Sequence, residues 1–306
     1  MNNEKIVVMG STNQDIVNLS ERIPSVGETI IGKRFMMSRG GKGANQAVAS
    51  SKLGGDVTFI TCLGNDPFGQ RIVKEYKEIG MDISNLELVD NIDSGMALIM
   101  VDFDGHNCIS VAPNANAMLT KEVVESKKDI FISANYFLTQ METPIDGVEL
   151  ALKLVKENGG FTILNPAPAS KLESNTFKYI DIITPNETEA EILTGIQIKN
   201  EMDAKQAAKI FIKNGVKNVI ITLGSKGAYL YNDDIRGKLI PGYKVKAVDT
   251  TAAGDTFNGA LIVALSEGKG IEEAIEFSHK ASAISVQKVG AQRSIPVRRA
   301  VDCFAL

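Results

Sequence analysis

The chain lacks tryptophan and has only three cysteines and two histidines among its 306 residues. Cys62, Cys108 and Cys303 are far apart and form no CxxC pair. They therefore predict reduced thiols in a cytoplasmic protein, and neither a disulfide framework nor a zinc site. His106 and His279 lie in no pattern with a serine or cysteine nucleophile, which argues against a hydrolytic triad.

A surplus of positive charge and long apolar runs are also absent. The formal net charge is −4, and basic residues gather only in short clusters such as Lys127–Lys128 and Arg298–Arg299. We therefore expect no nucleic-acid partner. No window approaches the ~18 apolar residues that span a bilayer. The polar N-terminal stretch is unlike a signal peptide, so we also expect no membrane partner.

Short β-rich apolar runs alternate with helical patterns along most of the chain. Strands are predicted over residues 5–10, 56–64, 161–166, 181–186 and 218–224, and helices over 44–53, 68–79, 148–156, 187–193 and 204–213. This alternation predicts an α/β fold with a three-layer core, in which a mostly parallel sheet has helices on both faces. Ligands of such sheets bind beyond the carboxyl ends of the strands.

Two segments, residues 13–38 and 95–112, lack helical spacing, and the second predicts a hairpin around "DFDGHN". We interpret them as a small antiparallel β-sheet inserted into the core. Because such a sheet cannot bury both of its faces by itself, it should act as a lid, a dimer surface or both. The core domain would then comprise residues 1–12, 39–94 and 113–306.

The stretch "DTTAAGDTF", residues 249–257, ends a β-branched run and begins a long apolar helical pattern. Gly254 tolerates a backbone conformation that other residues resist. The amides of residues 252–255 would point outward at a helix N-terminus, which favours an anion such as phosphate. Asp255 would lie beside that anion and could take a proton from a hydroxyl group. Taken alone, Asp255 is more simply explained as a helix N-cap.

A second glycine-rich stretch, "SRGGKGANQAVASSKLG", opens another predicted helix at residues 38–54. Its glycines allow close backbone approach to a ligand, and Lys42 and Asn45 supply donors, although a solvated helix start is the simpler explanation. Asn13 and Asp15 are two residues apart and would face the same side of an extended chain. Such a pair suits the adjacent hydroxyls of a polyol, or else an Asx turn.

Two later stretches have both a structural and a functional explanation. Asn186 and Glu189 in "TPNETEAE" have capping-box spacing, which explains them fully. Alternatively, Asn186 reaches a nucleotide phosphate and Glu189 holds Mg²⁺ through water. "TLGSKGAYL", residues 222–230, is a turn between two strands, or a site where backbone meets a flat base. Glu142, as an isolated glutamate after a strand pattern, would ordinarily be a surface residue.

Six stretches in one order point to a known family: "GGKGANQAVA", "NPAPA", "DIITPNETEAE", "ITLGSKGA", "DTTAAGDTFNGAL" and "GAQRSIP". Together they resemble the PfkB family of sugar kinases, and within it the ribokinases, over residues 5–297. The resemblance implies ATP-dependent phosphorylation of D-ribose at its 5-hydroxyl. It also implies Mg²⁺, an activating K⁺ ion, and a homodimer in which the lid sheets of two subunits clasp each other.

The resemblance also carries roles onto individual positions. Asp255 would be the catalytic base, with the amides of Ala252, Ala253 and Gly254 around the transferred phosphate. Ribose would be held by Asn13, Gln14, Asp15, Gly41, Lys42, Gly43, Ala44, Asn45 and Glu142, with Asp255 completing the set. ATP would contact Asn186, Thr222, Leu223, Gly224, Ser225, Lys226, Gly227, Gly254, Asp255 and His279. The K⁺ site would be Asp249, Thr251, Ser285, Lys288, Gly290 and Ser294, and the magnesium motif falls on Asn186 and Glu189.

One position departs from the ribokinase pattern. Asn114 in "APNANAMLT" stands where those proteins usually carry glycine, near the expected sugar pocket. Because asparagine is the best replacement for glycine at left-handed backbone angles, the turn should be kept. The alternatives are a related kinase for deoxyribose, another sugar or a nucleoside, and more remotely a sensor of sugars or nucleotides without catalysis. A nucleoside would need an aromatic shelf, and no aromatic cluster flanks residues 13–15 or 40–45.

Overall fold

The structure, a computed structural model, describes residues 4–304. Within this range the main sheet has eight strands in the order β14-β13-β12-β11-β10-β9-β1-β4. The strands are β1 (Lys5–Met9), β4 (Asp56–Ile60), β9 (Tyr136–Thr139), β10 (Phe161–Leu164), β11 (Ile182–Ile183), β12 (Asn218–Thr222), β13 (Gly227–Tyr231) and β14 (Lys238–Pro241). All pairings from β4 to β12 are parallel, and β13 and β14 are added antiparallel. The predicted mostly parallel sheet is confirmed.

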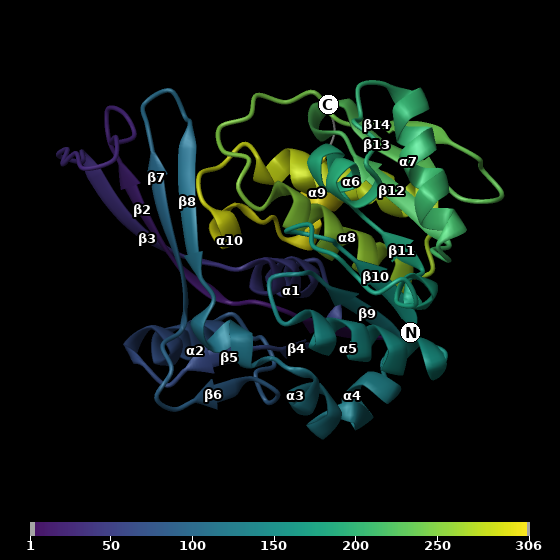
Figure 1. The fold of residues 1–306 in the computed structure, drawn as a ribbon, viewed down its shortest axis with the longest axis horizontal. Coiled ribbons are helices and arrows are strands. Elements are labelled where there is room, and N and C mark those ends of the chain that lie inside the picture. The colour runs from purple at the N-terminus through teal and green to yellow at the C-terminus, as the bar shows by residue number, and fades with distance from the viewer. Residues whose placement is uncertain (1–3, 305–306) are drawn as a thin grey trace.

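Helices cover both faces of this sheet, as predicted (Figure 1). Alternation along β1 explains the two cores: Ile6 and Val8 pack into one apolar cluster, and Val7 and Met9 into the other. The first cluster includes side chains of α1 (Lys42–Lys52), α2 (Pro67–Glu78), α8 (Ala253–Ser266), α9 (Ile271–Ser285) and α11 (Arg298–Asp302). The second includes side chains of α3 (Lys121–Ser126), α4 (Lys128–Ile132), α5 (Ile145–Glu157), α6 (Glu187–Thr194) and α7 (Glu201–Lys213). No helix within residues 4–304 is both long enough and apolar enough to cross a membrane.

The prediction of one continuous strand over residues 56–64 is wrong. β4 ends at Ile60, and a separate strand β5 (Cys62–Gly64) pairs in parallel with β6 (Glu87–Val89) in a sheet of its own. The break follows from the neighbouring strand, because β1 ends at Met9 and offers β4 no partner beyond Ile60. All three cysteines are free thiols, which agrees with the expected absence of a disulfide framework.

A second, four-stranded sheet stands at one side of the molecule (Figure 1). Its order is β3-β2-β7-β8, with β2 (Asn13–Leu19), β3 (Arg34–Gly40), β7 (Gly95–Val101) and β8 (Asn107–Ala112). The small sheet and its hairpin were predicted. Two of its pairings, β2 with β3 and β7 with β8, are antiparallel, and the central pairing of β2 with β7, which joins them, is parallel. All six residues of the edge strand β8 are exposed.

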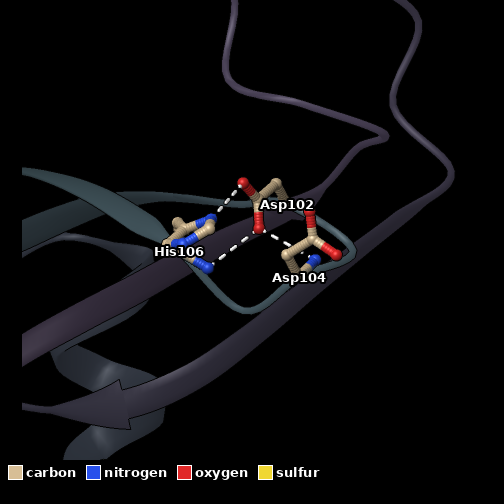
Figure 2. Close-up of side chains that lie close together, drawn as sticks. All are labelled: Asp102, Asp104 and His106. Atoms are coloured by element: carbon tan, nitrogen blue, oxygen red, sulfur yellow. Dashed lines mark hydrogen bonds and ion pairs between the residues drawn. The ribbon is translucent and has the colours of Figure 1, made fainter.

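The tip of the β7–β8 hairpin is organised by Asp102 (Figure 2). One carboxylate oxygen accepts the amides of Asp104 and His106, at 3.0 and 2.8 Å, and the other lies 2.9 Å from Nδ1 of His106. These contacts close the turn. Carboxylate and imidazole atoms of the three residues lie within 4.8 Å of one another, but the turn itself already uses both oxygens of Asp102.

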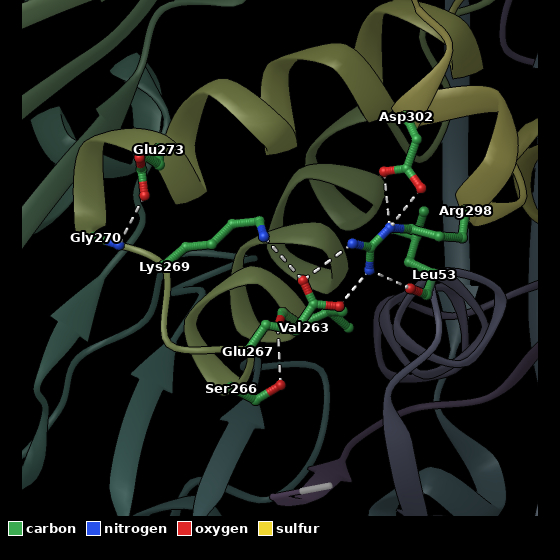
Figure 3. A network of polar contacts seen from close by, with 9 residues as sticks. All are labelled: Leu53, Val263, Ser266, Glu267, Lys269, Gly270, Glu273, Arg298 and Asp302. Carbon is green, nitrogen blue, oxygen red and sulfur yellow. Dashed lines mark hydrogen bonds and ion pairs between the residues drawn. The ribbon is translucent and has the colours of Figure 1, made fainter. Parts of the chain in front are cut away.

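The C-terminal helix α11 is fastened to the core through Arg298 (Figure 3). Its guanidinium donates to the carboxylate of Glu267 just after α8, to Asp302 in its own helix at 2.9 Å, and to the carbonyl of Leu53 after α1 at 3.2 Å. Lys269 adds a second cation 3.2 Å from Glu267. This network holds the ends of α1 and α8 together, and these two helices carry the candidate site at their opposite ends.

Candidate active site

Asp255 lies in the first turn of α8 and is only 8% exposed. Two amide side chains of α1 hold its carboxylate: Nδ2 of Asn45 donates to Oδ2 at 2.9 Å, and Nε2 of Gln46 donates to Oδ1 at 3.0 Å. The N-cap of α8 is Ala252, and no side chain caps that helix end. The simpler explanation of Asp255 as an N-cap is therefore wrong.

The turn that begins α8 leaves most of its amides unpaired. Ala252 has a φ of 60°, whereas Gly254 lies within the helix, so the expectation that Gly254 takes the unusual conformation is wrong. Gly254 leaves space instead, because a Cβ there would meet nothing within 4 Å. The amide of Ala253 donates to the carbonyl of Thr250 at 3.1 Å. Within residues 4–304, the amides of Ala252, Gly254 and Asp255 have no such partner, and the positive end of the helix macrodipole faces the same space.

Below Asp255, Gln46 belongs to a buried chain of amides that sequence reasoning missed. Oε1 of Gln46 accepts from Gln140 at 2.7 Å, and Nε2 of Gln46 donates to Oδ1 of Asn165 at 3.0 Å as well as to Asp255. These contacts fix which end of the Gln46 amide faces the carboxylate. Gln46 and Asn165 stand inside the "GANQAVA" and "NPAPA" stretches, which was the signal available in the sequence.

This series of hydrogen bonds continues from Asn165 to the other side of the α8 turn. Asn165 donates to the carbonyl of Thr184 at 3.1 Å, and the Thr184 hydroxyl donates to Oδ1 of Asn258 at 2.7 Å. Asn258 in turn donates to the carbonyl of Gly254 at 2.9 Å. All of these side chains are buried, so each hydrogen bond is formed away from competing water.

Glu142 is only partly exposed and has defined partners, unlike an ordinary surface glutamate. Its Oε2 accepts the hydroxyl of Ser11 at 2.6 Å and the amide of Lys42 at 3.0 Å, while Nζ of Lys42 lies 3.6 Å from Oε1. Gly43 packs directly on the β1 turn, where a Cβ would lie 2.4 Å from the carbonyl carbon of Gly10. The start of α1 thus packs against Ser11 through the amides of Gly43 and Ala44. These two residues and the N-cap Gly41, all predicted to bind the sugar, place their backbone beside Lys42 and Glu142.

Asn13 and Asp15 share one face of β2, as alternation predicts. Asn13 accepts from Nδ2 of Asn116 at 2.7 Å, and Asn116 is a buried residue that sequence reasoning did not single out. Gln14 lies on the opposite face, apart from the others, and donates to the carbonyl of Ser38 at 2.9 Å.

The turn just before Asn116 contains Asn114, which adopts the expected left-handed conformation with a φ of 45°. Nδ2 of Asn114 donates to the carbonyl of Ser94 at 3.0 Å, so the side chain also fastens the turn to the start of the small sheet.

The acidic residues of this site shift one another's pKa values. Burial, reinforced by the charges of Glu142 and Asp255 and opposed by Lys42, raises the pKa of Asp15 to about 7. Burial also raises the pKa of Asp255, although Lys42 and the hydrogen bonds from Asn45 and Gln46 favour its ionised form. Burial alone would lower the pKa of Lys42, but Asp255, Glu142 and Glu189 together raise it. A protonated lysine among three carboxylates therefore balances the local charge.

Two of the predicted nucleotide-binding segments, at Asn186 and at residues 222–227, lie side by side. The capping box of Asn186 and Glu189 is present, with contacts of 2.8 and 2.9 Å, and Asn186 forms a β-bridge with Thr222. The turn of residues 222–227 follows, with Leu223 buried and Gly224, Ser225 and Lys226 exposed; Gly227 pairs with Pro241. His279 of α9 is buried against Phe257, its Nδ1 has no partner within residues 4–304, and burial lowers its pKa to about 4 against the opposing carbonyl of Pro241.

Of the six residues predicted for K⁺, Thr251 and Gly290 meet at the carboxylate of Asp249, and the Lys288 amide donates to the carbonyl of Ser285 at 3.1 Å. Oδ1 of Asp249 accepts the amide of Thr251 at 2.9 Å, and Oδ2 accepts the amide of Gly290 at 2.8 Å. Burial opposes ionisation of Asp249, but these hydrogen bonds lower its pKa overall. Ser285 and Ser294 are buried with their hydroxyls bonded to carbonyls of neighbouring residues, and Lys288 is exposed.

A buried carboxylate beside unpaired helix amides, beyond the carboxyl ends of parallel strands, is suited to moving a phosphoryl group onto a hydroxyl group. Comparison with known families agrees with this class. The pfkB family of carbohydrate kinases matches residues 3–298. The chain therefore belongs to the PfkB family of carbohydrate kinases.

Individual relatives within this family are named as kinases of particular sugars. The ribokinase of Haemophilus influenzae is 44% identical over 96% of this chain and 96% of its own length. The structure of Arabidopsis thaliana ribokinase complexed with ribose and ATP superposes with a TM-score of 0.92 at 34% identity, with both chains covered completely, at 100%. The deoxyribokinase of Salmonella typhi is 33% identical over 95% of each chain.

Proposed function

We propose that this chain is an ATP-dependent kinase that phosphorylates D-ribose at its 5-hydroxyl, giving ribose 5-phosphate and ADP. The observation that carries the proposal is the carboxylate of Asp255, which is buried, clamped by two amides and placed beside the unpaired amides of the α8 turn. Relatives of high coverage that are named ribokinases support ribose as the substrate.

Asp255 acts as the general base in this proposal. The 5-hydroxyl of ribose gives its proton to the carboxylate as its oxygen attacks the γ-phosphorus of ATP, and ADP leaves on the opposite side. Asn45 and Gln46 keep the carboxylate in position and favour its ionised form. Because little covalent work is left to the protein, positioning and charge stabilisation supply most of the rate.

The α8 turn stabilises the transferred group. The amides of Ala252, Gly254 and Asp255 would donate to its equatorial oxygens, whereas the Ala253 amide is already used within the turn. Asn186 and Glu189 would hold Mg²⁺ through water, and the ion, when bound, neutralises charge on the phosphates of ATP. Glu189 fits this role because only one of its oxygens is used in the capping box. Burial raises its pKa, whereas the Asn186 amide and the charge of Lys42 favour its ionised form.

The sugar would be held on the other side of Asp255. Asn13, Asp15 and Glu142 offer acceptors for ribose hydroxyls, and Lys42 and Asn45 offer donors. Nδ2 of Asn45 reaches Asp255 while its Oδ1 is buried without a partner within residues 4–304, which leaves that oxygen for a sugar hydroxyl. Residues 13–38 and 95–112 would form the lid that excludes water during transfer.

ATP would lie between the turn of residues 222–227 and α9, with His279 beside the base. The K⁺ site would comprise Asp249, Thr251, Ser285, Lys288, Gly290 and Ser294. The carboxylate of Asp249 and nearby backbone carbonyls are oxygen donors suited to such an ion, which would add fixed positive charge close to the start of α8. We place the activity in the cytoplasm, where ATP is available and the three free thiols remain reduced.

The protein would work as a homodimer joined through the small sheet. Edge strand β8 is exposed along its whole length and includes Ile109 and Val111, which are 53% and 50% exposed. An exposed apolar edge strand is normally covered in a stable protein. A second copy of the same sheet is the partner that fits this surface.

A coupled assay of ADP release on ribose, 2-deoxyribose, fructose and adenosine tests the substrate. Ribose should give the highest kcat/KM, and a higher value for any of the other three would overturn the assignment. Asp255→Asn tests the mechanism and should lower kcat by ~10²–10⁴ while ribose and ATP still bind. Asp233→Asn, an exposed aspartate in a loop, is the matched control and should retain full activity. Near-normal turnover of Asp255→Asn would remove that residue from its role.

A further inference from the structure

Asn116 belongs to the 3₁₀ turn η1 (Asn114–Met118), lies against the start of β2 and is only 2% exposed. Its Oδ1 accepts the amide of Thr12 at 2.8 Å, while its Nδ2 donates to the carbonyl of Thr12 at 3.2 Å and to Oδ1 of Asn13 at 2.7 Å. We propose that Asn116 is a positioning residue of the sugar site, which directs the amide of Asn13 so that Nδ2 of Asn13 donates to a sugar hydroxyl. This inference rests on the proposed function, because the sugar is the one named there.

The backbone of Thr12 determines which way the Asn116 amide points. A main-chain N–H can only donate and a main-chain carbonyl can only accept, so Thr12 is satisfied by one orientation of Asn116 alone. In that orientation Nδ2 of Asn116 faces Asn13, and only an oxygen can accept from it. Oδ1 of Asn13 is therefore turned toward Asn116, and Nδ2 of Asn13 is turned away from it.

Gly95, the first residue of β7, leaves the space in which the two amides meet. It is paired with Asn13 across β2 and β7. A Cβ on Gly95 would lie 2.1 Å from Nδ2 of Asn116 and 2.4 Å from Oδ1 of Asn13. Both distances are far shorter than a van der Waals contact, so any side chain here would push the amides apart. The hydrogen bond between Asn13 and Asn116 thus requires glycine at this position.

The elements on both sides of Asn116 are also held in place. The hydroxyl groups of Thr12 and Thr61 lie 2.9 Å apart, and the amide of Ala115 donates to the carbonyl of Asp93 at 3.0 Å. Turning the Asn13 amide over would set its NH₂ group against that of Asn116, and both side chains are buried from water that could compensate. The surroundings therefore select one direction of the Asn13 amide before a sugar binds.

The sugar site is rich in acceptors and has few donors. Its carboxylates are those of Asp15, Glu142 and Asp255. Nδ2 of Asn45 is already bonded to Asp255. Asn13 is only 3% exposed, yet its Nδ2 donates to no group within residues 4–304, although buried amides normally have partners. A hydroxyl carries one proton and two lone pairs, so a sugar needs donors from the protein as well as acceptors. Nδ2 of Asn13 supplies such a donor, and Oδ1 keeps a lone pair for a second hydroxyl.

Alanine variants test the proposal through the kinetics of ribose phosphorylation. Asn13→Ala removes the donor, and Asn116→Ala releases the Asn13 amide; each should raise KM for ribose by roughly tenfold or more, because a hydroxyl loses its partner. The turnover number should change by less than about threefold, since the contact is made equally before and during transfer. Asn175→Ala, at an exposed position in a turn, is the matched control and should behave like the wild type.

The double variant separates positioning of Asn13 from general damage to the fold. If Asn116 acts through Asn13, adding Asn116→Ala to Asn13→Ala should change KM by less than about twofold. A further tenfold rise in the double variant would overturn the proposal, as would a KM of Asn116→Ala equal to that of the wild type. Absence of ribose phosphorylation by the wild type would instead overturn the proposed function. The same variants would then be compared on whichever of 2-deoxyribose, fructose and adenosine gives the wild type its highest kcat/KM.

Nuclear magnetic resonance of the wild type gives a readout that needs no folded variant of Asn116. The side-chain NH₂ signals of Asn13, assigned by their absence from the spectrum of Asn13→Ala, should shift when ribose is added to saturation. Unchanged Asn13 signals in a ribose-saturated sample would refute the donor role.

Discussion

The amide of Gln46 should decide how well Asp255 works as a base. Gln46→Met keeps the length of the side chain but removes the donor that lies 3.0 Å from Oδ1 of Asp255. A hydrogen bond to a charged group contributes about 1.5–3 kcal/mol. At 1.36 kcal/mol for each factor of ten, its loss should reduce kcat/KM for ribose by roughly 10- to 150-fold. Oδ1 of Asn165 and Nε2 of Gln140 would also lose their partner.

The pH profile separates this positioning role from general damage to the fold. Burial already raises the pKa of Asp255, and the hydrogen bond from Gln46 opposes that effect. Without the donor the pKa rises further, so the acidic limb of kcat/KM should move to higher pH. Misfolding alone would lower the whole profile without moving the limb.

Gln70→Met, the same change at an exposed position of α2, is the matched control and should leave both rate and profile unchanged. Folding of each variant is checked by circular dichroism. A folded Gln46→Met variant with an unshifted acidic limb and kcat/KM within twofold of the wild type would refute the reasoning.

Three further predictions concern the remaining parts of the proposal. The pKa of Asp15 is raised from 3.8 to about 7, so the native state holds this proton more tightly than the unfolded chain, and stability due to this group falls as pH rises between these values. Asp15→Asn should therefore raise the thermal midpoint more at pH 8 than at pH 4, while weakening ribose binding; an equal change at both pH values would contradict this. Asp249→Asn should abolish the difference in rate between K⁺ and tetramethylammonium, and an unchanged ratio would exclude the Asp249 site. Ile109→Asp should convert a dimer into a monomer in light scattering, whereas Met202→Asp on the exposed side of α7 should not; a wild-type monomer would contradict the proposed assembly.

The sequence was informative where a pattern is local. Buried β-branched runs predicted the parallel sheet because a strand covered on both faces, such as β1, must be apolar wherever it is buried, here from Ile6 to Met9. Capping-box spacing predicted the start of α6, which is also a local pattern, since Asn186 and Glu189 satisfy each other's amides. The break at Ile60 was missed because the end of β4 is determined by the length of β1, a partner about fifty residues away in sequence.

Contacts between distant side chains were beyond prediction. Gln46 and Gln140 are separated by 94 residues, and although Gln46 stands inside the "GANQAVA" stretch, nothing in the sequence shows that the two amides meet. Gly254 was expected to supply conformational freedom, yet Ala252 takes the positive φ. Glycine is the usual residue for that conformation, so the sequence pointed to the wrong position. The unusual angle at Ala252 follows from how the turn is held by the surrounding structure.

The carbonyl groups of that turn explain how its amides are presented. The carbonyl of Ala252 accepts from the amide and hydroxyl of Thr256 at 2.8 and 2.9 Å, that of Ala253 from Ser282 at 3.0 Å, and that of Gly254 from Asn258 at 2.9 Å. Because a peptide group is planar, fixing each carbonyl also fixes the direction of the next amide. The amides of Gly254 and Asp255 are thus oriented before any ligand arrives. A site organised in this way stabilises developing charge without reorganising during the reaction. The surrounding hydrogen bonds hold Ala252 in its strained conformation, so the positive end of α8 is already directed at a phosphoryl group.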